Sequence, residues 1–85
     1  MKDQAAWLKF AEVCRPSFDE CGFQAELIRA CGGQADLAWA VFYRLGEGSL
    51  GWLHARVPAL GQATPAALIA AGRADQVRDG LWRMP

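Results

Sequence analysis

Apolar residues recur at helical spacing along almost the whole chain, and they predict a series of short helices. A first helix over residues 3–15 is indicated by four apolar residues that share one face, Trp7, Phe10, Ala11 and Cys14. Pro16 is expected to end this helix, because proline disfavours helical dihedrals in the residue before it and has no N–H to donate.

A capping box predicts the start of a second helix at Ser17. In such a box the serine hydroxyl accepts from the backbone N–H three residues later, here that of Glu20, and the glutamate carboxylate reaches back. The helix is expected to run to about residue 31 and to stop at Gly32 and Gly33.

Residues 35–45 are apolar on nearly all sides and predict a buried central helix. A buried strand over residues 40–45 is also possible by composition alone. The chain has no second strand-like run to pair with it, however, and a lone strand would leave its backbone groups unsatisfied. The helix is therefore the prediction, ended by the glycines of residues 46–48.

Three shorter elements are predicted in the second half. Ser49 is expected to cap a helix that reaches about residue 55, and Pro58 forces a turn after it. Thr64 and Pro65 are a cap and a first helical residue, which predict a helix ending at Gly72. The last helix, residues 73–83, has an apolar face made of Ala74, Val77, Leu81 and Met84.

These elements predict a single all-α domain, residues 1–85, of five or six short helices. Residues 1–45 are expected to be supporting helices and residues 46–85 to contain the functional motif. Hydrophobic residues make up 53% of the 85, with four Trp and four Phe. So much apolar surface indicates either an aromatic-rich core or a surface covered by a partner, and a homodimer is expected.

Charge and composition exclude several classes of function. The net charge is zero, with five basic and seven acidic side chains in residues 1–48 and four and two in residues 49–85, so neither half resembles a phosphate-binding surface. Three cysteines and a single histidine are too scattered for a metal site, and the cysteines are expected in the core. No leader or membrane-spanning run is evident, which predicts a cytoplasmic protein. No catalytic motif occurs either, so the prediction is a non-enzyme without a cofactor.

An ordered set of residues in the second half resembles a known family. The set is Val41-Phe42, Trp52-Leu53, Pro58-Ala59-Leu60-Gly61, Thr64-Pro65, Leu68, Val77, Leu81 and Met84. It is similar, over residues 38–85, to the C-terminal toxin-binding domain of the MbcA/ParS/Xre antitoxins. Gln62 and Ala63 stand where that family usually has a second glycine and a basic residue.

The resemblance implies a small helical antitoxin that binds a RES-domain toxin, an enzyme that degrades NAD, and keeps its active site closed. It also implies that the C-terminal end lies near the toxin's pocket, which makes Pro85 and the three residues before it candidates for closing that pocket. Arg73, Arg78 and Arg83 are expected either to be solvated or to meet an acidic or phosphate-binding pocket of the toxin.

Nine residues are therefore the candidate partner contacts: Trp52, Pro58, Leu60, Thr64, Arg73, Arg78, Trp82, Arg83 and Met84. Trp52 is expected to lie mainly in the core, whereas Trp7 and Trp82 are expected to be exposed aromatic anchors. Two other functions stay open: a small DNA-binding transcriptional regulator that uses the N-terminal helices, and a phage- or mobile-element-encoded inhibitor of another effector, such as a defence nuclease.

Overall fold

The chain folds as an all-α domain, as predicted. The computed structural model describes residues 4–84, and every regular element in that range is helical. Six α-helices and two 3₁₀ turns follow one another: α1 Gln4–Phe18, α2 Gln24–Ala30, α3 Ala35–Leu45, η1 Gly46–Gly48, α4 Ser49–Leu53, η2 Pro58–Leu60, α5 Pro65–Ala70 and α6 Ala74–Arg83.

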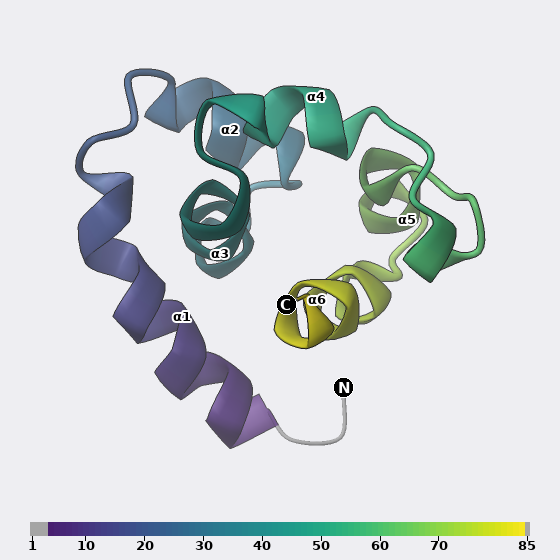
Figure 1. The fold of residues 1–85 in the computed structure, drawn as a ribbon, viewed down its shortest axis with the longest axis horizontal. Coiled ribbons are helices and arrows are strands. Elements are labelled where there is room, and N and C mark those ends of the chain that lie inside the picture. The colour runs from purple at the N-terminus through teal and green to yellow at the C-terminus, as the bar shows by residue number, and fades with distance from the viewer. Residues whose placement is uncertain (1–3, 85) are drawn as a thin grey trace.

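Helix α3 lies in the middle of the molecule, with α1, α2, α4 and α6 arranged around it (Figure 1). Its side chains Leu37, Ala38, Ala40 and Val41 are completely buried. The prediction of a central helix over residues 35–45 is confirmed, and the alternative strand is excluded. Two alanines on this helix allow the neighbouring helices to approach closely, and α1 makes its most extensive contact here.

The prediction that Pro16 ends the first helix is wrong. Helix α1 continues through Pro16 to Phe18. Pro16 has no N–H to donate to the Glu12 carbonyl, but it is exposed, so water can bond that carbonyl instead. The extra turn buries Phe18, whose ring makes an edge contact with Phe42 at 6.3 Å between centroids.

The predicted capping box at Ser17 is wrong for the same reason. Ser17 belongs to the last turn of α1, and its carbonyl accepts from the Glu20 N–H at 3.1 Å. Helix α2 begins only at Gln24 and has no side-chain cap. Instead, Gln24 Nε2 donates to the Phe18 carbonyl at 2.9 Å, which ties the start of α2 to the end of α1.

The stop at Gly32 and Gly33 is confirmed. The Gly33 N–H bonds the Ile28 carbonyl and the Gly32 N–H bonds the Arg29 carbonyl, which together form a Schellman motif. Gly32 has φ +68°, and a Cβ added there would lie 2.8 Å from Ile69 Cγ2. Both the left-handed backbone and the close approach of α5 therefore require glycine at position 32.

Ser49 is not the cap that the sequence predicted. It is the first residue of α4, which ends at Leu53 rather than near residue 55. The buried Ser49 hydroxyl donates toward two carbonyls at the end of α3, that of Gly46 at 2.6 Å and that of Val41 at 3.4 Å. Ser49 thus satisfies carbonyls that the end of α3 would otherwise leave open.

The core is built from fully buried aliphatic side chains of α2, α3, α4 and α6, together with Trp7 of α1. Cys14, Cys21 and Cys31 are free and buried, as expected for core-filling thiols. Burial raises the pKa of Cys14 to about 11, although the charge of Arg44 opposes it. Burial, with a contribution from Asp36, raises the pKa of Cys31 to about 12.

Candidate partner-binding groove

The turn between α4 and α5 is closed by its own backbone. Val57 pairs with Ala63 in an isolated bridge, and the Val57 carbonyl accepts from Leu60 at 2.9 Å and Gln62 at 3.0 Å. Gly61 and Gln62 both have positive φ, +67° and +66°. Gln62 thus stands in a conformation that favours glycine, which is the residue that the resembled family has there.

Thr64 is the N-cap of α5, as predicted. Its hydroxyl accepts from the Ala67 N–H at 3.2 Å, and Pro65 takes the first helical position, where no donor is needed. The cap sets the direction of the chain as it leaves the turn, so that Pro65 and Leu68 are buried.

A second contact fixes the turn against the last helix. A Cβ added at Gly80, inside α6, would lie 2.9 Å from Leu60 Cδ2. Leu60 is therefore seated against the backbone of α6 where a side chain is missing. A glycine inside a helix costs ~1 kcal/mol of stability relative to alanine. The close packing of Leu60 explains why position 80 is nevertheless a glycine.

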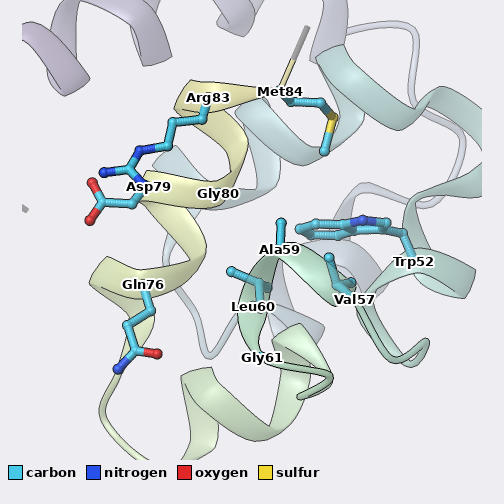
Figure 2. A pocket seen from close by; sticks show the side chains of 10 residues that line it. All are labelled: Trp52, Val57, Ala59, Leu60, Gly61, Gln76, Asp79, Gly80, Arg83 and Met84. Atoms are coloured by element: carbon cyan, nitrogen blue, oxygen red, sulfur yellow. The ribbon is translucent and has the colours of Figure 1, made fainter.

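Beside this contact the surface is hollowed into a groove of about 560 Å³. One wall comes from α4 and the turn, with Trp52, Val57, Ala59, Leu60 and Gly61, and the other from α6, with Gln76, Asp79, Gly80, Arg83 and Met84. Figure 2 shows the two walls facing each other, with the Met84 side chain directed toward the Trp52 indole.

The groove has an apolar floor and a polar edge. Trp52, Leu60 and Met84 are half-buried and pack against the core while still lining the groove. Asp79 and Arg83 place one charge of each sign on the α6 side. Such a surface suits an apolar side chain or a short segment of another protein, with polar groups that fix its orientation.

Four of the nine candidate contacts meet in this groove: Trp52, Leu60, Arg83 and Met84. Pro58 is exposed beside it, in η2, and Thr64 serves as the helix cap. Arg73 is exposed at the N-terminal end of α6 and does not line the groove. Pro85 lies outside the described residues.

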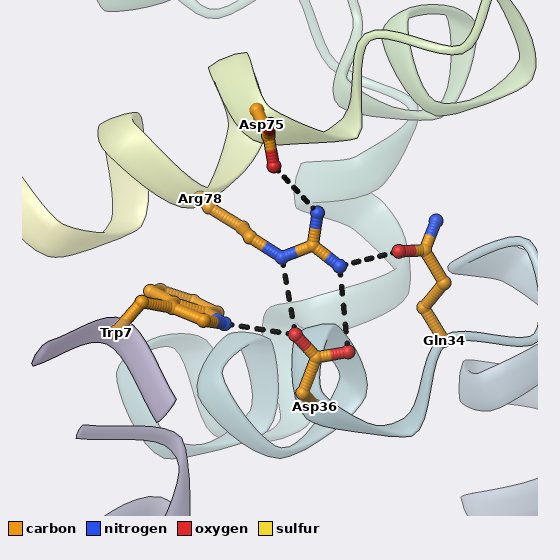
Figure 3. Close-up of polar contacts among 5 residues, drawn as sticks. All are labelled: Trp7, Gln34, Asp36, Asp75 and Arg78. Carbon is orange, nitrogen blue, oxygen red and sulfur yellow. Dashed lines mark hydrogen bonds and ion pairs between the residues drawn. The ribbon is translucent and has the colours of Figure 1, made fainter. Parts of the chain in front are cut away.

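Arg78 lies neither in the groove nor on a solvated face. Its side chain is only 15% exposed and forms the centre of a polar cluster, the Asp36 cluster, made of Trp7, Gln34, Asp36, Asp75 and Arg78 (Figure 3). Arg78 Nε donates to Asp36 Oδ2 at 3.1 Å, Nη1 donates to Asp75 at 2.9 Å, and Nη2 also donates to the Gln34 side-chain carbonyl. The expectation of a solvated Arg78 is thus wrong, because the side chain is held between helices.

Asp36 holds the cluster together from α3. Its carboxylate accepts from Trp7 Nε1 at 2.8 Å as well as from Arg78. Burial by itself would raise the pKa of Asp36, but the hydrogen bonds from Arg78 and Trp7 outweigh it and hold the pKa below its usual value. The carboxylate is therefore ionised at neutral pH.

The two tryptophans predicted to be exposed anchors behave differently. Trp7 is 1% exposed, and its indole faces Asp36, so its expected exposure is wrong. Trp82 is 43% exposed at the last turn of α6, as predicted, and lies on the side of α1, where its ring meets Phe10 at 5.4 Å.

Sequence reasoning missed the α6 side of the groove. Gln76, Asp79 and Gly80 carry no motif, and their position depends on how the turn packs. Gly80 offered one signal, since a glycine inside an otherwise regular helix marks a close backbone approach.

Comparison of the chain with protein-family models, with curated proteins and with solved structures finds no match. Within residues 4–84, no helix is long and apolar enough to cross a membrane. The same range contains no group of three or more His, Cys, Asp or Glu side chains that could hold a metal ion.

Proposed function

We propose that this chain is a protein-interaction module of the antitoxin type, which binds a RES-type, NAD-degrading toxin and closes its active site. The observation that supports the proposal is the groove between the turn and α6. It gathers Trp52 and Leu60 with Arg83 and Met84, from the end of the last helix, into one concave surface. The resemblance to the antitoxin domain supplies the class of partner.

In this proposal the groove receives an apolar segment of the toxin, and the end of α6 closes the toxin's pocket. The half-buried apolar side chains exclude water from the contact, and Arg83 pairs with a carboxylate at its edge. Gly80 supports the surface indirectly, because it lets Leu60 reach its place in the groove.

The proposal is tested by co-expressing the chain with the product of the neighbouring gene and following growth and complex formation on a sizing column. The wild-type chain is expected to relieve toxicity and to co-elute with the toxin. Arg83→Glu should lose both properties, because it reverses the charge beside the groove.

Arg73→Glu is the matched control, since it makes the same charge reversal on the same helix but away from the groove. It should retain rescue and co-elution, with helical content checked for both variants by circular dichroism. Absence of a complex with the wild-type chain, or equal loss in both variants, contradicts the proposal.

A further inference from the structure

A second distinctive surface lies on the opposite side of α6, where α1, α3 and α6 meet. Phe10 of α1 is half-buried at its centre. The Phe10 ring makes edge contacts with Tyr43 at 6.1 Å and with Trp82 at 5.4 Å between centroids. Tyr43 is 46% exposed and Trp82 43%, so two large rings face solvent side by side with Phe10.

The Arg44 guanidinium lies over these rings and forms no ion pair or hydrogen bond within residues 4–84. The Arg44 guanidinium carbon lies 5.0 Å from the Phe10 ring centroid and 6.0 Å from that of Tyr43. Arg44 Nε is buried and has no hydrogen-bond partner within the described part of the chain. The two terminal nitrogens of Arg44 form no hydrogen bond among the described residues and are not buried in the same way, so they reach solvent.

The described carboxylates of α1, α3 and α6 are not paired with Arg44. Asp36 and Asp75 bind Arg78, Glu12 lies 3.8 Å from Arg15, and Asp79 lines the groove. Arg44 therefore differs from Arg78, which is held by three side chains, those of Gln34, Asp36 and Asp75. Its guanidinium is already positioned by ring stacking, and the terminal donors of its fork remain open.

We propose that Phe10, Tyr43, Arg44 and Trp82 form a second binding site, the aromatic–arginine site, which takes a carboxylate presented by a protein partner beside an apolar side chain. The planar guanidinium fork matches a carboxylate in two hydrogen bonds. The rings shield that ion pair from water on one side and supply the apolar contact. Trp, Tyr and Arg together are also the side chains that contribute most to the cores of protein interfaces.

A nucleic-acid strand is the less favoured occupant. Bases could stack on the rings, but affinity for a phosphate backbone depends on many cations, and the chain has no net charge. A carboxylate needs only the one fork that the site offers.

The site is tested by ¹⁵N-detected NMR titration of the whole chain. The probe is the blocked dipeptide acetyl-leucyl-aspartate amide, and its control is the uncharged isostere acetyl-leucyl-asparagine amide. The resonances to follow are the Arg44 Nε–H, which burial protects from exchange, and the Trp82 indole N–H. The aspartate probe is expected to shift both with a Kd on the order of 1 mM, and the asparagine probe to bind roughly ten-fold more weakly.

Arg44→Gln removes the fork but no ion pair or hydrogen bond of the described residues, so it is expected to keep the fold. It should abolish the preference for aspartate. Equal binding of the two probes, no shift of either resonance, or an unchanged preference in Arg44→Gln would overturn the proposal. So would tighter binding of a thymidine octanucleotide at the same resonances. None of these results depends on the groove, because the site uses the other side of α6.

Discussion

Replacing Asp36 by asparagine should cost more stability than its partly exposed position suggests. The change keeps the shape but removes the charge that accepts from Trp7 and Arg78. The side chains of Asp36 and Arg78 are only 22% and 15% exposed, so Arg78 would remain largely buried with its main partner gone. A hydrogen bond to a charged group contributes ~1.5–3 kcal/mol, and breaking a buried pair costs ~3–5 kcal/mol. Because solvent reaches part of this pair, we expect a loss of about 2–3 kcal/mol.

The free energy of unfolding is best measured by urea denaturation at pH 7, followed by circular dichroism. For a domain of this size the loss corresponds to a fall in Tm of about 10–20 °C. Asp75→Asn is the matched control, because Asp75 binds the same Arg78 at 2.9 Å but is 64% exposed. Its loss should be at most about 0.5 kcal/mol.

The pH dependence supplies a second check. The pKa of Asp36 is lower in the folded chain than in the unfolded chain. The ionised carboxylate therefore contributes fully to stability above the pKa of the unfolded chain, and this contribution is lost as the pH falls through the pKa of the folded chain. The stability difference between wild type and Asp36→Asn should therefore be largest near pH 7 and shrink below about pH 4. The reasoning is refuted if Asp36→Asn is as stable as wild type at pH 7, or if Asp75→Asn is the more damaging change.

Three further outcomes follow from local geometry. Gly32→Ala should lower the free energy of unfolding by about 1–3 kcal/mol, because position 32 combines a positive φ with too little space for a Cβ. Gly51→Ala is the control, because Gly51 lies in a helix with nothing within 4 Å; in the same urea assay it should leave stability unchanged or raise it by up to ~1 kcal/mol. Thr64→Ala should lose about 1 kcal/mol by removing the cap of α5, and an unchanged urea midpoint would contradict this. The pKa values of Cys14 and Cys31, about 11 and about 12, predict that iodoacetamide at pH 8 leaves both thiols unmodified in the folded chain and labels both in urea. Peptide mass mapping detects the label, and rapid labelling of the folded chain would contradict the burial of these thiols.

Elements with strong local signals were predictable from the sequence. The central helix α3 and the cap at Thr64 depend on composition and on one side chain bonding its own backbone. The errors at Pro16 and Ser17 arose because a non-local gain, burial of Phe18 beside Phe42, outweighed two local stop and start signals. The hydrophobic pattern indicates that Phe18 is buried, but it does not indicate to which helix Phe18 belongs.

The candidate site divides in the same way. Trp52 and Leu60 belong to a recognisable motif, whereas the opposite wall of the groove exists only because the turn packs on α6 at Gly80. The Asp36–Arg78 pair, 42 residues apart, could not be read from spacing either, because nothing local distinguishes a paired arginine from a solvated one.

The Asp36 cluster also determines how the chain can be divided. Its members come from α1, from the start of α3 and from α6, so the segment that contains the recognisable motif is fastened through Arg78 to residues near the opposite end of the chain (Figure 3). Residues 46–85 taken alone would keep the turn and the groove residues but would lose Trp7, Gln34 and Asp36, together with the central helix. The proposed binding surface thus depends on the rest of the chain. If residues 46–85 alone fail to bind, the failure would indicate loss of this support and not the absence of a site.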